Sequence, residues 1–334
     1  MLYDARVDDR VRITDVAPRD GLQNEPGIVP VAAKRDLIAA IAGTGVHEIE
    51  VTSFVSPKRV PQLADAAELV KSIAAIKPEH ARYSALVPNS RGMDRLLEVN
   101  ADVHRTDGIE RCIDKIALFT AASETFSERN VGASIEGTLE RFEPVIQRAR
   151  EHDLATRGYI SCAVACPHEG DIEPEAVAQV AGALLDLGVE EIDLGDTIGE
   201  GTPDTIARVL LAVIERLDGR HTSSRGEPTL TLHLHDTFGR AADCVRAAID
   251  LGVRSFDASS GGLGGCPFAS TPGRRAPGNI AMTDLLDAIE AMGLQTGVTD
   301  RAKLAVASAT AERIVAAARL ESAVEADHSE GDQA

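Results

Sequence analysis

The sequence predicts an α/β protein of the (β/α)8 TIM-barrel class with an extra C-terminal helical segment. Two observations carry this prediction. β-Rich runs alternate with amphipathic helical runs eight times over roughly 280 residues, close to the typical size of about 250 residues for such a barrel. The competing open doubly wound sheet usually carries a glycine-rich fingerprint in its first βα turn. The stretch "APRDGLQNE" at that position contains a single glycine.

The predicted strands are short runs rich in β-branched residues and bounded by turn-forming residues. In chain order they cover 11–17, 48–54, 82–88, 114–120, 156–164, 191–197, 229–235 and 255–260. Each strand precedes a segment whose apolar residues recur every three or four positions, as on the buried face of a helix. These segments cover 31–45, 62–76, 90–100, 134–153, 173–188, 202–217, 240–252 and 282–293. A last helix is predicted over 301–320, packed outside the barrel.

Composition narrows the class of protein. We expect one barrel domain over 1–320 and a disordered tail over 321–334, because the last stretch is acidic and poor in apolar residues. A net charge of −19 with 3% aromatic residues argues against nucleic-acid binding. The chain lacks any run of about 18 apolar residues, so we expect no membrane span. The charged start "MLYDARVDDR" does not resemble a secretory signal, and a cytoplasmic protein is expected. We also expect a homo-oligomer, with a dimer as its simplest form.

The cysteines do not predict a structural cross-link. Five cysteines are an odd number, and none is expected to pair in a reducing compartment. Cys162 and Cys166 form a C-x3-C spacing, but no second cysteine pair accompanies them. A structural zinc site is therefore not expected there.

The seventh predicted strand, "TLTLHLHDTFG", has two different faces. Its three leucines share one face, while Thr231, His233 and His235 share the other. In a barrel the leucines would meet the helices and the histidines would point inward near the catalytic end. Two imidazoles on a rigid strand suit a divalent metal ion, whereas the alternative is a pair of internal histidines bonded to backbone. Asp236 lies on the leucine face and is not expected to be a ligand.

Other strand ends add polar candidates at the same end of the barrel. Arg19 and Asp20 open the first loop, Glu50 shares a face of the second strand with Glu48, and Asp196 ends the sixth. The eighth strand runs into "GGLGGCP", where Cys266 follows four glycines. Such a loop could be a mobile lid that brings a thiol to a substrate. The alternative is a glycine-rich linker with an incidental cysteine.

These motifs resemble the 3-hydroxy-3-methylglutaryl-CoA lyase family, one of the metal-dependent barrel lyases and synthases. The resemblance covers roughly 11–295 and rests on "APRDGLQNE", "EVTSFVSPKRVPQ", "RGYISCAVACPHEG", "DLGDTIGEGTP", "LHLHDTFG" and "GGLGGCPFA". It implies cleavage of an acyl-CoA to acetyl-CoA and acetoacetate, as in leucine degradation or ketone-body formation. It also implies Mg2+ or Mn2+ as the cofactor.

The resemblance implies roles for individual residues. The metal ligands would be Asp20, His233, His235 and Asn279. Arg19 would stabilise the enolate of acetyl-CoA, and Cys266 would protonate it. His233, Asp20 or a metal-bound water would take the hydroxyl proton. The supporting or substrate-contacting residues would be Gln23, Glu50, Asp196, Thr197, Gly264 and Gly265.

The chemistry of the reaction agrees with these roles. A metal ion that chelates the substrate hydroxyl and carboxylate lowers the hydroxyl pKa. A permanently charged guanidinium stabilises the developing enolate, and a thiol delivers a proton to carbon without prior ionisation. One departure from the family is that "STPGRRAPG" lengthens the connection between Cys266 and Asn279. Arg274 and Arg275 in it are candidates to meet CoA phosphates, or else are solvated loop residues.

Four other functions were considered. A lyase for a longer-branched 3-hydroxyglutaryl-CoA is the nearest rival, followed by a synthase that condenses acetyl-CoA with a 2-oxo acid. The "GGLGGCP" thiol favours the lyase over the synthase. A zinc hydrolase barrel would carry its H-x-H on the first strand rather than the seventh. A non-catalytic binding barrel would not need metal ligands and a thiol at one end.

Overall fold

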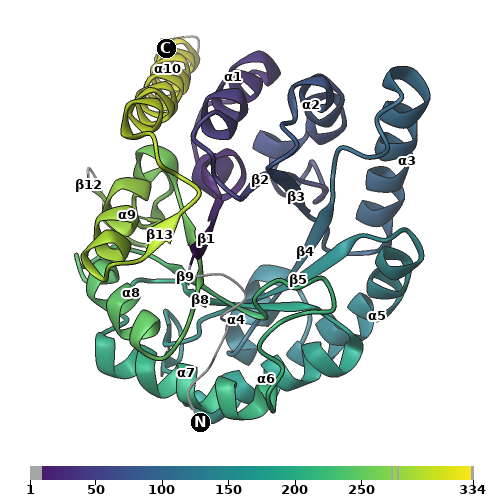
Figure 1. Ribbon diagram of the computed structural model, residues 1–334. Helices are drawn as coiled ribbons and strands as arrows, with labels where there is room; N and C mark the ends of the chain where they lie inside the picture. Colours follow the sequence, from purple (N-terminus) through teal and green to yellow (C-terminus); the bar gives the residue numbers. More distant parts are fainter. Residues whose placement is uncertain (1–9, 272–273, 277, 332–334) are drawn as a thin grey trace.

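The computed structural model describes residues 10–271, 274–276 and 278–331 (Figure 1). Within these residues, eight parallel strands close into a barrel, and β10 pairs with β1 to complete it. The barrel strands are β1 (Arg10–Asp15), β2 (Glu48–Ser53), β3 (Arg82–Leu86), β4 (Lys115–Ala121), β5 (Ala155–Ser161), β8 (Glu191–Asp196), β9 (Leu230–Leu234) and β10 (Ser255–Ala258). The predicted TIM barrel is confirmed.

A ring of helices surrounds the barrel (Figure 1). Its members are α1 (Val31–Ala42), α2 (Ala66–Ile73), α3 (Ser90–Asp107), α5 (Ile135–Glu151), α6 (Pro174–Leu187), α7 (Pro203–Leu217), α8 (Ala241–Asp250) and α9 (Met282–Ala291). The last helix, α10 (Arg301–Gly331), lies beside α1, outside the ring. Local signals start several of these helices. Thr202 caps α7 in a capping box, with Pro203 at the first helical position.

Short helices and strands lie within the loops between the barrel strands and the surrounding helices. They are η1 (Ala17–Gly21), η2 (Pro61–Leu63), η3 (Ala74–Ile76), α4 (Glu124–Val131), β6 (Ala165–Cys166), β7 (Gly170–Asp171), η4 (Ser260–Gly262), β11 (Cys266–Thr271), β12 (Arg274–Ala276) and β13 (Gln295–Thr296). Two of them build the functional end of the barrel. The π-helical turn η1 follows β1, and the antiparallel β11–β12 hairpin follows β10.

The two largest differences between predicted and observed boundaries are at the ends of helices α3 and α10. Helix α3 passes Asn100, where the predicted helix ended, because the buried Asn100 side chain accepts hydrogen bonds from the Cys112 and Ile113 amides. The residue is therefore a helix-to-loop contact and not a terminator. Helix α10 continues to Gly331, past residue 320 where the predicted helix ended. Residues 332–334 lie outside the described residues.

The two faces of the strands have different partners. The outward leucines of β9 are buried in the apolar layer between strands and helices, as predicted. The inward face is strongly charged: Lys115 Nζ bonds Glu191 at 2.7 Å and also contacts Glu48. Arg157 Nη2 lies 2.7 Å from Glu191. Barrel interiors are usually filled by branched apolar residues, so the interior of this barrel is unusually ionic.

Candidate metal centre and active site

Three predicted ligands converge at the C-terminal end of the strands. Candidate ligand atoms of Asp20, His233 and His235 all lie within 4.8 Å of one another, and no other such group of three occurs among the described residues. His233 is on β9 and 8% exposed, and His235 follows the end of that strand. Asp20 reaches them from η1. Residues at the two ends of the chain therefore meet because the barrel closes between β10 and β1.

Two contacts hold the η1 turn in place. Asp15, at the end of β1, accepts a hydrogen bond from the Ala17 amide at 2.9 Å and another from the Ser260 hydroxyl. Gly21 packs so closely on the neighbouring loop that an added Cβ would lie 2.8 Å from the Leu263 Cβ. The position of Asp20 thus depends on the loop after β10 as well as on its own turn.

The donor set fits a divalent cation. One carboxylate and two imidazoles suit a divalent transition metal ion, and they can hold Mg2+ or Mn2+ when oxygen ligands complete the shell. His235 Nδ1 is buried and has no hydrogen-bond partner among the described residues. His233 uses Nδ1 for a 3.0 Å contact with Asp257 Oδ2, so its Nε2 stays available. An unpartnered buried nitrogen beside a carboxylate is the environment that a cation would satisfy.

The charge states of these groups also suit metal binding. Burial raises the pKa of Asp20, but the nearby Arg19, His233 and His235 lower it further, so the carboxylate stays ionised. Burial and the neighbouring His233 lower the pKa of His235 to about 4, which leaves its imidazole neutral at pH 7. Burial lowers the pKa of His233, and the hydrogen bond and charge of Asp257 reverse the shift, so that the net direction is upward.

Asn279 lies beside this cluster, as the resemblance implies. Its Nδ2 contacts Asp20 Oδ2 at 2.9 Å and the Leu263 carbonyl at 3.2 Å. A backbone bridge also joins His235 to Asn279. The longer connection before it is taken up by the β11–β12 hairpin, in which Cys266 pairs with Ala276. The extra residues therefore extend away from the base of the loop and leave Asn279 in place.

The glycines at the base of this hairpin pack against Asn279. Gly264 has a φ of +114°, and an added Cβ would lie 2.8 Å from Asn279 Nδ2. A Cβ on Gly278 would lie 2.5 Å from the Gly265 amide nitrogen. The backbone before β11 and the backbone after β12 therefore approach each other more closely than side chains at these positions would allow. Gly264 and Gly265 shape the site through their backbone.

Arg19 is a buried cation between two carboxylates. Its side chain is 7% exposed and donates to Glu50 Oε2 through Nε and to Asp20 Oδ1 through Nη1, both at 2.6 Å. The guanidinium also lies 5.4 Å from the Tyr159 ring centroid. Burial lowers the pKa of Arg19, but the charges of Glu50 and Asp20 raise it above its usual value. Arg19 is therefore a permanently charged group next to the ligand cluster.

Some predicted site residues lie elsewhere. Asp196 shares the outward face of β8 with Leu194, and its Oδ2 accepts from the Gly201 amide at 2.8 Å. Burial raises the pKa of Asp196 to about 6. Thr197 Oγ1 accepts from the Cys162 amide at 2.7 Å, while its backbone meets the His235 imidazole. Gln23 is half-buried just after η1.

The predicted thiol and loop arginines are only partly described. Cys266 begins β11, and Arg274 and Arg275 lie in β12, but their side chains lie outside the described part of the structure. Asp236 Oδ1 accepts from the Ala241 amide at 2.9 Å, in agreement with its exclusion as a ligand. Cys166 is buried and accepts from the Ser123 hydroxyl at 3.1 Å.

Sequence reasoning missed three inward residues below the cluster: Arg157, Tyr159 and Asp257. The Tyr159 hydroxyl lies 3.2 Å from Glu50 Oε2 and 3.1 Å from Asp257 Oδ2. The sequence did contain a signal for them. Strand alternation places Arg157 and Tyr159 on one face of "TRGYIS", and it places Asp257 on one face of "SFDASS". Their importance depends on cross-barrel contacts that only the closed fold creates.

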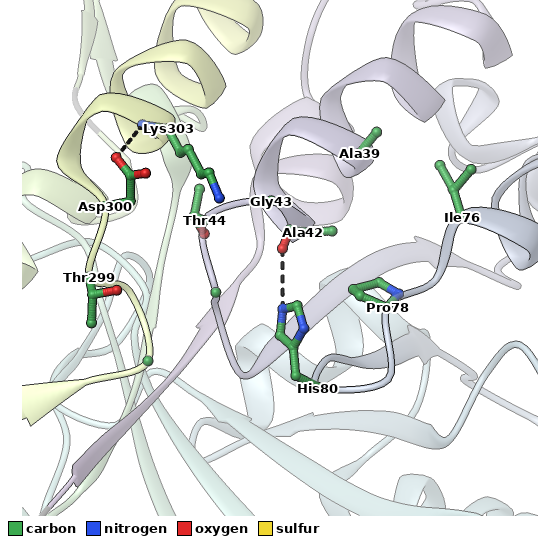
Figure 2. A pocket seen from close by; sticks show the side chains of 12 residues that line it. Ala39, Ala42, Gly43, Thr44, Ile76, Pro78, His80, Thr299, Asp300 and Lys303 are labelled. Carbon is green, nitrogen blue, oxygen red and sulfur yellow. Dashed lines mark hydrogen bonds between the residues drawn. The ribbon is translucent and has the colours of Figure 1, made fainter.

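Two cavities lie at the opposite end of the barrel. One, of about 480 Å³, is lined by Thr44, His80 and Lys303 and sits at the N-terminal ends of β2 and β3 (Figure 2). There His80 Nε2 lies 3.3 Å from the Ala42 carbonyl. The other has a volume of about 650 Å³ and is lined by ion pairs such as Lys77 with Asp114. Because barrel chemistry gathers at the C-terminal ends of the strands, neither is the active site.

Over the described residues, no helix combines the length and the apolar character that a membrane span requires.

A family model described as HMGL-like matches residues 10–310. The "3-hydroxy-3-methylglutaryl-CoA lyase, cytoplasmic" of Mus musculus is 42% identical over 288 residues, which cover 86% of this chain and 76% of that protein. The "3-hydroxy-3-isohexenylglutaryl-CoA/hydroxy-methylglutaryl-CoA lyase" of Pseudomonas aeruginosa is 40% identical over 86% of this chain and 88% of its own length.

Solved structures show the same likeness. The HMG-CoA lyase from Brucella melitensis superposes with a TM-score of 0.81 at 42% identity, over 92% of this chain and 99% of that one. An HMG-CoA lyase from Acinetobacter baumannii, in complex with coenzyme A and 3-methylmalate, has a TM-score of 0.78 at 33% identity, over 92% of each chain. The similarity therefore spans the whole barrel.

Proposed function

The chain belongs to the HMGL-like family, and on that premise we propose that it cleaves 3-hydroxy-3-methylglutaryl-CoA to acetyl-CoA and acetoacetate as a divalent-metal-dependent carbon–carbon lyase. The observation that carries this proposal is the convergence of Asp20, His233 and His235 beside the buried cation Arg19. A metal-type donor set next to a fixed positive charge suits a reaction that passes through an enolate.

The ligand set defines what the site offers to the substrate. Asp20, His233, His235 and Asn279 would hold Mg2+ or Mn2+, which supplies positive charge for the substrate hydroxyl and carboxylate oxygens when bound. Asp20 stays ionised and His235 neutral at pH 7, as ligands must be. Their positions are set by rigid elements, β9 and η1, so little ordering is needed when the ion binds.

The chain's own residues then account for the bond changes. The hydroxyl proton passes to Asp20, whose carboxylate has lone pairs beyond the one that would bind the metal ion. The C2–C3 bond breaks, C3 becomes the ketone of acetoacetate, and the electron pair stays with C2 as the enolate of acetyl-CoA. The Arg19 guanidinium stabilises the negative thioester oxygen of this enolate. The Cys266 thiol gives C2 its proton, and exchange with solvent restores both groups.

Glu50 has a supporting role in this scheme. It is fully buried and accepts from Arg19, and its Oε2 lies 3.2 Å from the Tyr159 hydroxyl oxygen. Burial raises the pKa of Glu50, and the Arg19 charge opposes that shift. Glu50 therefore orients the guanidinium without contacting the substrate. Gln23 and Thr197 would contact the acyl chain, and Asp196 would support the loop that follows β8.

A lyase for a longer-branched 3-hydroxyglutaryl-CoA is the second candidate. The Pseudomonas aeruginosa relative carries both activities in its name at 40% identity. The hydroxyl, carboxylate and thioester are common to both substrates, so the cluster and Arg19 would serve either one. Only the space around the C3 substituent would separate them.

We further propose that residues 1–320 act as one barrel domain, in a homo-oligomer within the cytoplasm, and that the reaction serves leucine degradation. The cytoplasmic assignment follows the name of the Mus musculus relative. Sedimentation of the purified chain would establish the size of the oligomer.

The experiment is direct. The purified chain is incubated with 3-hydroxy-3-methylglutaryl-CoA and Mg2+, and acetoacetate and acetyl-CoA are measured with and without a chelator. Equal amounts of both products are expected, with loss of activity in the chelator and recovery on adding metal. The isohexenyl substrate is run in parallel to compare kcat/KM. Absence of products from both substrates, or activity indifferent to the chelator, would contradict the proposal.

A further inference from the structure

We infer that Asp257 is a positioning residue that holds His233 in the tautomer and orientation needed for metal binding. The inference rests on the metal-binding part of the proposed function and goes beyond the ligand set. It concerns a buried carboxylate on β10 that contacts the ligand cluster directly through His233.

Direct contact supports this role. Asp257 Oδ2 lies 3.0 Å from His233 Nδ1, and the Asp257 side chain is 0% exposed. A carboxylate has no proton to donate here, so Nδ1 carries the hydrogen and donates it. The Nε2 lone pair is then free, and it is the nitrogen left to join Asp20 and His235. Metal-binding histidines commonly donate their other N–H to a carboxylate, which fixes the ring.

Two further residues hold Asp257 itself. The Tyr159 hydroxyl donates to Asp257 Oδ2 at 3.1 Å, and Arg157 Nη1 donates to Oδ1 at 3.1 Å. Arg157 is in turn tied to Thr14 at 2.9 Å and to Glu191 at 2.7 Å. The residues that make these contacts lie on β1, β5 and β8. Several strands therefore fix the position of Asp257 and, through it, the orientation of His233. Such a framework leaves the imidazole little freedom to rotate.

The same network contains a matched control, Asp193 on β8. Asp193 is fully buried and lies 3.4 Å from Arg157 Nη1, but it has no described contact with His233. Asp193→Asn therefore changes a second buried carboxyl group beside Arg157, and the pKa of that carboxyl group is raised by burial and by the Asp257 charge. Only Asp257→Asn touches the histidine.

The test measures metal affinity and tautomer rather than turnover. Mn2+ binding is followed by the loss of the free-ion EPR signal for the wild type, Asp257→Asn and Asp193→Asn, each checked for folding by circular dichroism. An asparagine can turn its NH2 toward Nδ1 and reverse the tautomer. We expect Asp257→Asn to weaken Mn2+ binding by about 10–100-fold, the usual range for such partners. Asp193→Asn should stay within about threefold of the wild type.

A second measurement uses the unaltered chain. With 15N-histidine labelling at pH 8, and His233 assigned by loss of its signals in His233→Gln, the metal-free wild type should show a protonated Nδ1 and an unprotonated Nε2. An Nε2–H tautomer in the wild type overturns the inference even if Asp257→Asn does not fold. Equal weakening by the two variants, or unchanged Mn2+ affinity in Asp257→Asn, also overturns it. A chain that binds Mn2+ in this way but forms no products would contradict the proposed function alone.

Discussion

Arg19 donates to Glu50 through Nε at 2.6 Å, and the same guanidinium reaches Asp20 through Nη1. The planar guanidinium thus joins the buried Glu50 carboxylate to Asp20, a proposed metal ligand. A lysine carries the same charge as a single point and cannot keep both contacts in this geometry. Replacing Arg19 by lysine therefore tests the hydrogen-bonding geometry of the guanidinium while the positive charge is kept.

We predict that Arg19→Lys lowers kcat by about 10²–10³-fold, as for loss of one group that stabilises an oxyanion. Mn2+ affinity should change far less, since the cation at this position is retained. Steady-state kinetics and Mn2+ titration would check the two quantities. Loss of Mn2+ binding in parallel with kcat would show that Arg19 acts through the metal centre instead.

Adjacent residues at the end of β9 should behave in opposite ways. His235→Ala removes a member of the ligand cluster, so we expect Mn2+ affinity to fall by more than the roughly 10–100-fold typical of an outer contact. Asp236→Ala removes a partner of the Ala241 amide at the start of α8. It should cost about 1 kcal/mol of stability and leave Mn2+ binding intact. Mn2+ titration and urea unfolding of both variants measure this, and impaired metal binding by Asp236→Ala would refute it.

Gly264→Ala should damage the site through the backbone. Its φ of +114° strains any side chain, and the new methyl would press on the Asn279 amide. We expect kcat/KM to drop at least about tenfold, with a stability cost on the order of 1–3 kcal/mol. Gly293→Ala is the control, because its φ is +74° but nothing lies within 4 Å of its added Cβ. Comparable kcat/KM in the two variants would exclude the steric explanation.

The ionic interior should be costly to break. Lys115→Met would remove one of the two buried cations that Glu48 and Glu191 share and leave them only Arg157. We expect a loss of about 3–5 kcal/mol in the free energy of unfolding, measured with urea. Lys71→Met is the matched control, because Lys71 is half exposed and solvent screens its ion pair with Asp102. If Lys115→Met lost less unfolding free energy than Lys71→Met, the buried ion pairs of the barrel interior would not stabilise the fold as proposed.

Asp196 predicts a pH dependence of stability. Burial raises its pKa from 3.8 to about 6, so between these values the folded chain binds more protons than the unfolded chain. Its contribution to stability is therefore full below pH 3.8 and is lost as pH rises toward 6, by up to about 3 kcal/mol. Asp196→Asn, which does not titrate, should lack this component.

The measurement is the difference in urea-unfolding free energy between the wild type and Asp196→Asn from pH 4 to pH 8. The wild type should lose stability relative to the variant as pH rises to about 6, and the difference should then be constant. If the wild type instead gained stability relative to Asp196→Asn as pH rises, the pKa of Asp196 in the folded chain would lie below 3.8.

The elements of the barrel were accessible from sequence because each depends on local pattern. Alternating residues in β9 and helical periodicity in segments such as α7 are visible in the chain itself. The exceptions are instructive. Asn100 looked like a helix end, yet its side chain bonds a loop twelve residues away. That contact depends on how the chain returns and not on local preference.

Much of the candidate site was accessible too. His233 and His235 were identified by spacing on one strand, and Asp20, Arg19 and Asn279 through resemblance. Asp196 illustrates the limit. It ends a barrel strand, as a site residue would, but strand alternation turns it toward its own loop, where it accepts the Gly201 amide.

By itself, therefore, the sequence determined the barrel, the end of it that carries chemistry, and the residue types gathered there. Only the tertiary structure decided which side chains share a hydrogen bond across the interior. His233 meets Asp257 because β9 and β10 are paired in register, and Tyr159 reaches Asp257 from β5 across the barrel. Periodicity sets the direction of a side chain, but its partner depends on barrel closure, which brings distant strands within hydrogen-bonding distance.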